Sequence, residues 1–221
     1  MSVLYLVSTP IGNLEDITLR AKRILSEVDV IACEDTRKTG NLLKQLGLPK
    51  KPFLSYYEEN EQQRIPQIIK QLQAGKNIAL VSSAGTPTIS DPGFKLVRQC
   101  RQEGIRVIPI PGPSAVLTAL VASGLPTNKF LFLGFLPKKP GKRKKVLASL
   151  PAKTTIIFFE SPYRLLKTLN DLNAIFGDIE IVICRELTKI HEEIRKEKTS
   201  QAIKHFEKTK VRGELTLLFV R

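Results

Sequence analysis

Short apolar runs alternate along the first half of the chain with longer stretches in which apolar residues recur every three or four positions. The run at 78–81 is uniformly apolar, as is typical of a buried strand, whereas residues 61–74 carry their apolar side chains on one helical face. This pattern predicts strands at 3–7, 30–33, 53–55, 78–81 and 107–110, with helices at 14–28, 39–46, 61–74 and from 94 onward. Such alternation indicates a mostly parallel sheet with helices on both faces.

The second half of the chain departs from this strand–helix alternation toward its end. Its pattern predicts strands at 130–135, 154–159, 179–185, 190–196 and 215–220, with helices at 114–123, 142–150, 163–176 and 200–206. Three elements come last along the chain: the strand at 190–196, the helix at 200–206 and the strand at 215–220. They favour a mixed sheet with antiparallel strands. A segment rich in proline and glycine at 109–113 separates the two halves. We therefore predict two α/β domains, residues 1–112 and 113–221.

The segment at residues 83–93 is the most informative loop. It follows the apolar run at 78–81 and precedes a helical pattern. Its eleven residues are more than the roughly 2–6 that usually connect a strand to a helix. Two prolines and two glycines restrict its path. Because α/β proteins bind ligands where a strand ends, we predict a rigid ligand-binding loop at this position.

The chain carries a formal net charge of +14, with a pI near 9.8. This excess indicates a polyanionic partner, either nucleic acid or an anionic membrane surface. Residues 1–112 hold 15 basic and 11 acidic residues, and residues 113–221 hold 20 and 10. No apolar run approaches the ~20 residues of a membrane span. The first residues lack a basic leader and a cleavage site, so we expect a cytoplasmic protein.

The positive charge is concentrated in a basic run at residues 138–145, where six of eight residues are Lys or Arg. A charge run is often only a solvated face. In favour of phosphate contact, this run straddles a Pro-Gly pair that reads as a loop, and it contains no acidic residue. We predict that it contacts a nucleic-acid backbone. The predicted contacts are Lys138, Lys139, Lys142, Arg143, Lys144 and Lys145.

The sequence gives little support to a metal site. Cys33, Cys100 and Cys184 lie far apart without zinc-ligand spacing, and their odd number fits a reduced cytoplasm. His191 and His205 are too few to bind zinc without cysteines nearby. We expect the cysteines to be small, buried apolar residues, and we expect no metal.

Standard nucleotide fingerprints are also missing. The loop after the first strand, residues 8–13, offers only Gly12, whereas a dinucleotide fold needs several glycines there. No Walker sequence is present, so nucleoside-triphosphate chemistry has no support.

Polar residues instead follow several of the predicted strands. Glu34, Asp35 and Arg37 follow the second strand, where they form either a catalytic cluster or a helix-capping turn. Residues 56–60 follow the third strand and allow the same two interpretations. Small, polar or proline residues end further strands at 111–115, 159–162, 185–189 and 212–214. Together these loops predict a cleft between two α/β halves.

Seven motifs occur along the chain in the order of a known family. They are residues 8–13 (Ser-Thr-Pro-Ile-Gly-Asn), 33–37 (Cys-Glu-Asp-Thr-Arg), 84–87 with 89–93 (Ala-Gly-Thr-Pro and Ile-Ser-Asp-Pro-Gly), 111–115 (Pro-Gly-Pro-Ser-Ala), 134–137 (Gly-Phe-Leu-Pro), 160–162 (Glu-Ser-Pro) and 185–189 (Arg-Glu-Leu-Thr-Lys). In these motifs the chain resembles the ribosomal RNA small subunit methyltransferase I family, within the tetrapyrrole methylase superfamily. The likeness spans nearly the whole chain.

The resemblance implies a two-domain tetrapyrrole methylase-like fold, with a mostly parallel N-terminal sheet and a mixed C-terminal α/β domain. It implies an S-adenosylmethionine-dependent homodimer that methylates a cytidine ribose 2′-oxygen in small-subunit ribosomal RNA or in the assembled subunit. This superfamily holds the cofactor in a folded conformation in the cleft between its domains, which accounts for the missing glycine fingerprint.

The same motifs carry the family's cofactor contacts onto this chain. Pro10 is expected to border the cofactor, and the turn 85–87 with Ile89 to meet its amino-acid and ribose parts. Ser114 and Ala115 would supply backbone donors at a helix start. The full predicted set is Thr9, Pro10, Ser83, Gly85, Thr86, Pro87, Ile89, Ser114, Ala115, Phe159, Leu187 and Leu215, of which the last three wall the adenine.

The chain departs from the family pattern at three places. The family usually has Asp where this chain has Ser83, histidines in the region 56–59, and His where Tyr163 stands.

For the reaction, our hypothesis is an in-line transfer of methyl to the ribose oxygen, assisted by positioning and by a nearby base. Glu34 and Asp35 are the candidate bases, and Arg37 is the candidate for stabilising anionic oxygen. Two alternatives stay open: a porphyrinoid methyltransferase with the same fold and cofactor, and a non-catalytic RNA-binding protein of ribosome assembly.

Overall fold

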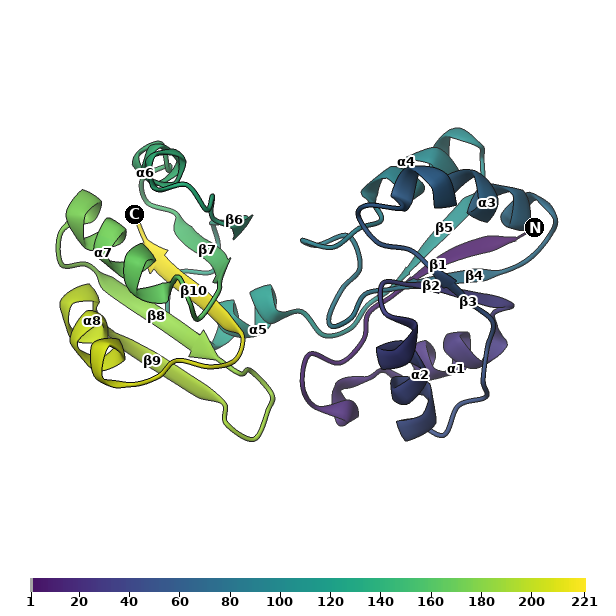
Figure 1. The fold of residues 1–221 in the computed structure, drawn as a ribbon, viewed down its shortest axis with the longest axis horizontal. Helices are drawn as coiled ribbons and strands as arrows, with labels where there is room; N and C mark the ends of the chain where they lie inside the picture. Colours follow the sequence, from purple (N-terminus) through teal and green to yellow (C-terminus); the bar gives the residue numbers. More distant parts are fainter. Residues whose placement is uncertain (1) are drawn as a thin grey trace. The chain divides into compact units, whose positions relative to one another are not determined.

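The computed structural model describes residues 2–221, which form two compact units. Unit 1 ends at Ser114, and unit 2 comprises Ala115–Arg221, whereas the sequence pattern places the boundary at residue 112. Each unit has its own sheet and its own hydrophobic core (Figure 1).

Unit 1 is built on a five-stranded parallel sheet with the strand order β3-β2-β4-β1-β5. Its strands are β1 (Val3–Val7), β2 (Val30–Cys33), β3 (Phe53–Ser55), β4 (Ile78–Val81) and β5 (Arg106–Ile110). Its α-helices are α1 (Leu19–Glu27), α2 (Thr36–Gln45), α3 (Glu61–Gln73) and α4 (Phe94–Gln102). Each connection between consecutive strands carries a helix, as parallel pairing requires. The predicted parallel α/β sheet is therefore confirmed.

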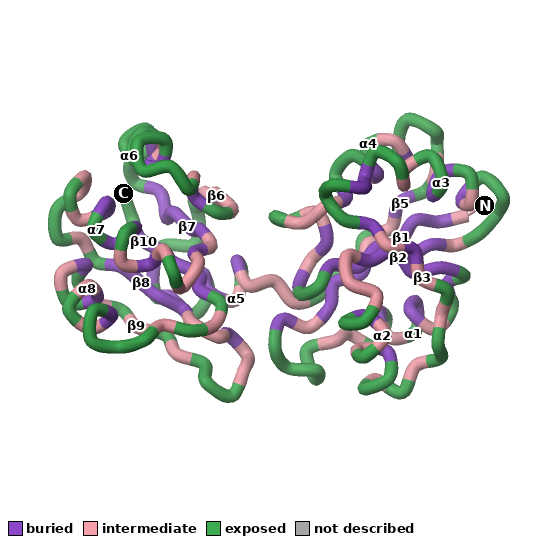
Figure 2. The backbone as a smooth tube through the Cα atoms, viewed as in Figure 1, coloured by how far each residue is buried: buried purple, intermediate pink, exposed green. Residues whose placement is uncertain are grey.

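Helices cover both faces of this sheet because alternate strand residues point to opposite sides. On β4, Ile78 and Leu80 pack with α3 and α4, whereas Ala79 and Val81 pack with α1 and α2. Strands that are buried on both faces read as continuous apolar runs in a sequence. In Figure 2 the buried residues of unit 1 lie mainly in its strands, while its outer helices and loops carry most of the exposed residues.

Helix α1 begins later than the apolar spacing predicts. Residues 14–16 form a 3-10 turn, in which the side chain of Asn13 accepts a hydrogen bond from the N–H of Glu15. Ile17 is then extended, with φ −68° and ψ 132°. Thr18 caps α1 by accepting from the N–H of Ala21. The prediction of one helix from residue 14 is wrong because the apolar spacing continues across two separately capped segments.

Unit 2 contains a five-stranded sheet with the order β6-β7-β10-β8-β9. Its strands are β6 (Phe130–Phe135), β7 (Thr155–Glu160), β8 (Glu180–Arg185), β9 (Glu193–Lys198) and β10 (Leu215–Val220). Its helices are α5 (Ala115–Ala122), α6 (Pro140–Ala148), α7 (Leu165–Phe176) and α8 (Thr199–Lys208). Strand β6 is parallel to β7, and all other neighbours are antiparallel. The predicted mixed sheet is confirmed.

The two faces of this second sheet are covered differently. Helices α6, α7 and α8 pack on one face, where Phe158 and Leu217 belong to the core. Ile157 and Leu218 on the opposite face are also fully buried, and there α5 contacts β7 and β10.

Helix α6 begins at Pro140, two residues before its predicted start at 142. Proline suits the first turn because its missing N–H is one that a helix start leaves without an intrahelical partner. The Pro-Gly pair of the basic run therefore opens a helix, which corrects the expectation of a loop.

Candidate functional site

The carboxyl ends of the parallel strands bring the predicted site segments of unit 1 to one edge of the sheet. Residues 8–13 follow β1, residues 34–37 follow β2, and residues 82–93, the β4–α4 loop, follow β4. Ligands of open parallel sheets bind at this edge. Because β4 lies between β2 and β1, the β4–α4 loop starts between the loops of these two strands.

A short antiparallel bridge joins the β4–α4 loop to the loop after β1. The N–H of Thr9 donates to the carbonyl of Gly85 (2.9 Å), and the N–H of Gly85 donates to the carbonyl of Thr9 (3.0 Å). Gly85 has a φ of +80°, and an added Cβ would lie 3.3 Å from Cγ2 of Ile11. The bridge therefore favours glycine at this position and fixes the turn 85–87 beside Thr9.

The hydroxyl of Thr86 ties a third loop to these two. Ser8 Oγ donates to Thr86 Oγ1 (3.1 Å), which in turn donates to the carbonyl of Pro113 (3.0 Å). Close packing at Gly112 supports the same junction, since an added Cβ would lie 2.8 Å from Cβ of Ser8. The predicted segments after β1, β4 and β5 therefore meet through Ser8, Thr86 and Pro113.

The backbone of the β4–α4 loop is strained. Thr88 (φ 74°) and Ser90 (φ 61°) adopt left-handed conformations that are uncommon for residues other than glycine. Such strain costs about 1–3 kcal/mol per residue and tends to occur at ligand sites. The loop is held by its surroundings, as the predicted rigid ligand loop requires.

Replacing Gly93 by alanine is expected to lower the free energy of unfolding by about 2–5 kcal/mol, from a positive φ and overpacking together. The new Cβ would lie 2.7 Å from Leu80 Cδ2 and 2.9 Å from Thr88 Cγ2, at a φ of +133°. Gly75→Ala is the matched control, because Gly75 also has a positive φ (+89°) but no atom within 4 Å of the added Cβ. Urea unfolding compares the two, and equal losses would contradict the packing argument.

Two carboxylates lie near the start and the end of the β4–α4 loop. Ser83 Oγ donates to Glu34 Oε2 (2.9 Å), which joins the loop to the end of β2. Burial, and then the charge of Glu34, raises the pKa of Asp91 to about 6, although a hydrogen bond from Ser82 acts in the opposite direction. Glu34 therefore lies at the end of β2 in contact with the β4–α4 loop, and its role as a base stays a prediction. Asp91 was not among the predicted site residues, although its position in the Ile-Ser-Asp-Pro-Gly motif is a sequence signal for it.

Asp35 serves as the cap of α2, which begins at Thr36. Its Oδ1 accepts from the N–H groups of Arg37 (2.9 Å) and Lys38 (3.1 Å). The bond from Lys38, and then that from Arg37, lowers the pKa of Asp35. A weakly basic carboxylate with an engaged oxygen is poorly suited to remove a proton, so the capping interpretation describes Asp35. The side chain of Arg37 is exposed in the first turn of α2.

The segment after β3 anchors the far end of the β4–α4 loop. Tyr56 is fully buried and donates its hydroxyl to Glu61 Oε1 (2.7 Å). Glu61, only 4% exposed, also accepts from the N–H of Gly93 (2.9 Å) and pairs with Lys95 (3.0 Å). Tyr56 and Glu61 therefore hold the loop where it enters α4, which is a structural role.

The three residues of unit 2 that are predicted to wall an adenine do not share one surface. Leu215 is 3% exposed, and its side chain belongs to the core under α6, α7 and α8. Phe159 follows the core residue Phe158 by one position, so it lies on the opposite face of the sheet. Leu187 is buried in the turn after β8. The side chain of Leu215 is thus unavailable to a ligand, while Phe159 and Leu187 stay predicted contacts.

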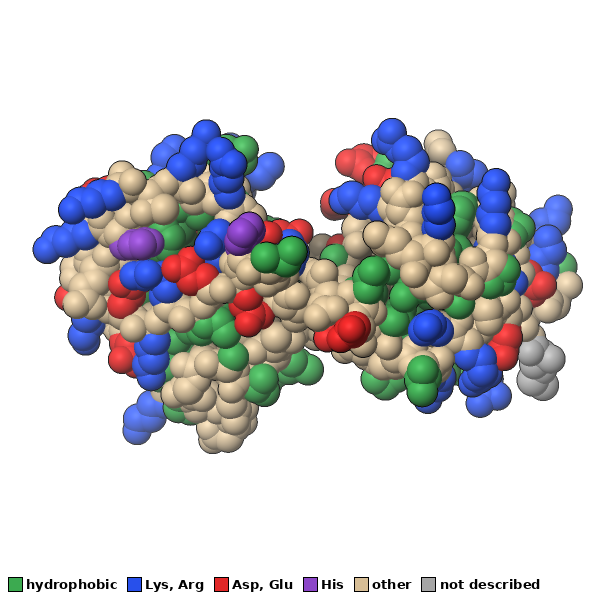
Figure 3. Space-filling model, turned by 90° about the horizontal axis from the view of Figure 1, so that it is seen from below, with side chains coloured by type: hydrophobic (Ala, Val, Ile, Leu, Met, Phe, Trp, Pro, Cys, Tyr) green, Lys and Arg blue, Asp and Glu red, His purple; other side chains and the backbone are tan. Residues whose placement is uncertain are grey.

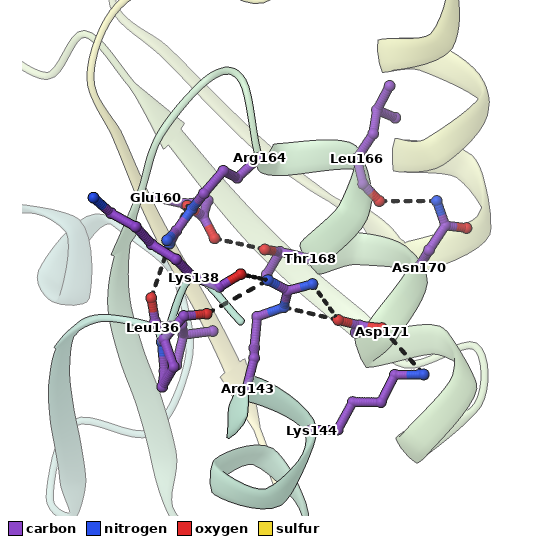
Figure 4. Close-up of polar contacts among 11 residues, drawn as sticks. Leu136, Lys138, Arg143, Lys144, Glu160, Arg164, Leu166, Thr168, Asn170 and Asp171 are labelled. Atoms are coloured by element: carbon purple, nitrogen blue, oxygen red, sulfur yellow. Dashed lines mark hydrogen bonds and ion pairs between the residues drawn. The ribbon is translucent and has the colours of Figure 1, made fainter. Parts of the chain in front are cut away.

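Arg143 corrects the prediction for the basic run. Its side chain is 3% exposed, its Nε donates to Asp171 Oδ2 (2.7 Å), and its Nη1 contacts the carbonyls of Pro137 and Lys138 (3.5 and 3.4 Å; Figure 4). A buried guanidinium engaged in this way cannot reach a phosphate. Lys144 also points its Nζ to within 3.5 Å of Asp171. The remaining lysines of the run are exposed: Lys138, Lys139, Lys142 and Lys145.

Metal and membrane features are absent from residues 2–221. Within this range there is no cluster of three or more His, Cys, Asp or Glu side chains that could hold a metal ion, and no helix suited to spanning a membrane. Cys33, Cys100 and Cys184 are free and buried, and burial raises the pKa of each thiol. On the faces seen in Figure 3, Lys and Arg side chains are spread over both units.

An open hollow of about 300 Å³ lies at the other end of the unit 1 sheet. It is lined by α3, by β3 and by residues that precede strands, namely Asp29, Pro52 and Lys76. Because parallel sheets bind ligands at the carboxyl ends of their strands, we assign the site to the junction around Thr86 and not to this hollow.

Comparison with known proteins agrees with the sequence motifs. The family model of the tetrapyrrole (corrin/porphyrin) methylases matches residues 3–203. A ribosomal RNA small subunit methyltransferase I from Thermotoga maritima is 50% identical and covers 99% of this chain and 98% of its own length. A protein of the same name from Halalkalibacterium halodurans is 49% identical and covers 97% of this chain and 74% of its own length.

Solved structures share the fold at low sequence identity. A uroporphyrin-III C-methyltransferase from Thermus thermophilus has a TM-score of 0.71 at 19% identity and covers 99% of this chain and 94% of its own. Diphthine synthase has a TM-score of 0.74 at 14% identity, with 99% and 90% covered. By its family model and by a relative that is 50% identical over 99% of this chain, the chain belongs to the tetrapyrrole methylase family and, within it, to the ribosomal RNA small subunit methyltransferase I family.

Proposed function

We propose that this chain transfers a methyl group to the 2′-oxygen of a cytidine ribose in small-subunit ribosomal RNA. Its membership of the family makes it a methyltransferase that uses S-adenosylmethionine. The observation that carries the proposal is the junction of three strand-end loops at Ser8, Thr86 and Pro113. The choice of RNA is supported by the 50% identical, full-length relative named for that substrate. The cytidine and its ribose oxygen follow from the family resemblance.

The residues at this junction fit S-adenosylmethionine. Ser83, Ala84 and Ile89 of the β4–α4 loop are exposed and so accessible to a ligand, whereas Gly85 is buried and bridged to Thr9. The N–H groups of Ser114, which precedes α5, and of Ala115, its first residue, suit the carboxylate of the cofactor's amino-acid part. The charge of Glu34 would attract a cation at this edge of the sheet. When bound, the cofactor supplies a methyl group on a positively charged sulfur.

Asp91 and Glu34 are proposed as the groups that accept the proton of the ribose hydroxyl. A general base works best when its pKa lies near the working pH, and the pKa of Asp91 is raised to about 6. Glu34 is close enough for its charge to contribute to that raised pKa, and it accepts a hydrogen bond from Ser83. Arg37, exposed at the start of α2, is proposed to stabilise anionic oxygen.

Methyl transfer is expected to fall about tenfold for each pH unit below about pH 6, because Asp91 is protonated there and cannot accept a proton. Single-turnover rates measured across pH test this expectation. Asp91→Asn should abolish the inflection. Burial is the main cause of the raised pKa of Asp91 and the charge of Glu34 the second, so Glu34→Gln should shift the inflection to lower pH without returning it to the ordinary value. An inflection that persists unchanged in Asp91→Asn would assign the base to another group.

Replacing Lys138, Lys139, Lys142 and Lys145, the exposed lysines of the basic run that make no ion pair with Asp171, by glutamine is expected to weaken RNA binding and to flatten its dependence on salt. Each lost phosphate contact should reduce the slope of log K against log salt by about 0.7–0.9. Filter binding over a range of salt concentrations measures both quantities. A control that removes the same charge elsewhere replaces Lys70, Lys76, Lys204 and Lys208, which are also exposed. A salt slope like that of the unaltered protein would contradict phosphate contact by the run.

The proposed function is tested with radiolabelled S-adenosylmethionine and small ribosomal subunits that lack the modification. Label on a cytidine ribose would support it. Transfer to a porphyrinoid but not to RNA would favour the tetrapyrrole enzyme, and tight RNA binding without transfer would favour an assembly protein. The predicted homodimer is checked separately by light scattering.

A further inference from the structure

Strand β6 contains a bulge that places the ring of Phe135 on the face of the sheet opposite to the one that regular alternation would give it. Phe132 pairs with Ile157 and Phe135 pairs with Phe159, so β6 uses one residue more than β7 between these two pairs. Gly134 supplies the positive φ (63°) that such a bulge needs. In a regular strand Phe132 and Phe135 would point to opposite faces. The bulge instead places both of them on the face that carries Phe159.

The three rings form a small cluster at this end of β6. The centroid of Phe159 lies 5.0 Å from that of Phe132 and 5.5 Å from that of Phe135, with edge-to-face or tilted geometry. Phe135 is nevertheless 59% exposed. Phe159 thus supports the ring of Phe135 from one side, while much of that ring is open to solvent.

The chain that follows Phe135 leads directly into the basic run and is held firmly. Arg164, paired with the buried Glu160, donates to the carbonyl of Leu136 (3.0 Å). Arg143, paired with Asp171, contacts the next two carbonyls, as Figure 4 shows. Two arginines, each paired with a buried carboxylate, therefore fix the path from the aromatic ring to the first lysines.

We propose that Phe135 is a stacking platform for an unstacked base of single-stranded RNA, whose phosphates are bound by Lys138, Lys139 and Lys142. Bases that have left a helix stack on aromatic side chains beside basic residues, and the positive charge here matches a phosphate backbone. The proposal rests on RNA being the substrate. It deepens that function, because it gives the enzyme a preference for a nucleotide in a loop or a melted segment over one in a duplex.

Tryptophan fluorescence tests the platform directly, because the chain contains no tryptophan. In Phe135→Trp, a single-stranded RNA oligonucleotide should quench the only indole, and a hairpin duplex of the same composition should quench it much less. Phe130→Trp is the matched control, because Phe130 is exposed on the same strand but is absent from the aromatic cluster. It should show little quenching with either RNA.

Affinity measurements complete the test. Phe135→Leu should bind the single strand roughly 5- to 160-fold more weakly than the unaltered protein, which is the range of one lost stacking contact. Its duplex affinity and its salt dependence should not change, and Phe135→Tyr should bind as the unaltered protein does. Circular dichroism confirms that each variant is folded.

Other outcomes would overturn the proposal. Equal quenching by single strand and duplex would show no base stacking. A Phe135→Leu variant that binds and methylates RNA normally would contradict the stacking role of Phe135 and leave the proposed function intact. A change in oligomeric state without a change in RNA affinity would assign Phe135 to contact with a second copy of the chain. Failure of the unaltered protein to bind or methylate RNA would remove the proposed function itself, and the platform with it.

Discussion

Replacing Arg143 by methionine is expected to lower the free energy of unfolding by about 3–5 kcal/mol, the range for removing one partner of a buried ion pair. The variant leaves Asp171 buried, with Lys144 at 3.5 Å as its remaining ion-pair partner. It also removes the donors to the carbonyls of Pro137 and Lys138. Urea unfolding followed by circular dichroism measures the loss.

The controls separate burial from charge. Lys142→Met removes a positive charge from the same helix at an exposed position, and it should change stability by less than about 1 kcal/mol. The double variant Arg143→Met with Asp171→Leu should be more stable than Arg143→Met alone, because no unpaired charge then stays buried. If Lys142→Met were as damaging as Arg143→Met, the loss would come from helix charge rather than from the buried pair.

Replacing Glu61 by alanine is expected to lower the free energy of unfolding by about 2–5 kcal/mol, because two buried donors lose their acceptor. These donors are the hydroxyl of Tyr56 and the N–H of Gly93. The pair with Lys95 adds little, since that lysine is about half exposed (47%). The anchor of the β4–α4 loop is lost as well, so the affinity for S-adenosylmethionine should fall together with stability.

Glu61 also predicts a dependence of stability on pH. Burial by itself would raise the pKa of this carboxyl, but the hydrogen bonds from Tyr56, Lys95 and Gly93 lower it below its ordinary value of 4.5. A carboxyl whose pKa is lower in the folded state stabilises the protein above its unfolded-state pKa, and this contribution disappears as the pH falls through the folded-state value. The difference in stability between the unaltered protein and Glu61→Gln should therefore shrink on acidification.

Unfolding free energies at about pH 7 and about pH 3 measure this effect. Glu59→Ala, which removes a nearby exposed carboxyl, should alter stability only slightly at either pH. A constant difference between the unaltered protein and Glu61→Gln at the two pH values would contradict the role of the charged carboxylate.

The sheet of unit 1 and its ligand edge were predictable because both depend on local pattern. Strands covered on both faces are continuously apolar, and parallel strands must place their following loops at one edge. The segments containing Thr9, Thr86 and Pro113 could therefore be grouped before their contacts were known. Their order along the chain also carried the family resemblance, which the family model and the relatives confirm.

The properties of individual side chains were harder to predict. The acidic partner of Arg143 is Asp171, 28 positions further along the chain. The residues of the basic run therefore do not indicate that Arg143 is paired and buried. The bulge at Gly134 turns Phe135 to a face that regular alternation does not give it. Asp91 owes its raised pKa to burial and to Glu34, which are properties of its surroundings.

The amino-acid pattern by itself therefore determined the alternation of strands and helices, the excess of positive charge and the family. These features depend on short-range periodicity and on composition. Only the tertiary structure decided which charges of the basic run reach solvent, which carboxylate has a pKa near neutrality, and which rings share a face. Each of these depends on burial and on partners that are distant in sequence, because desolvation and pairing energies arise only when separate segments pack together.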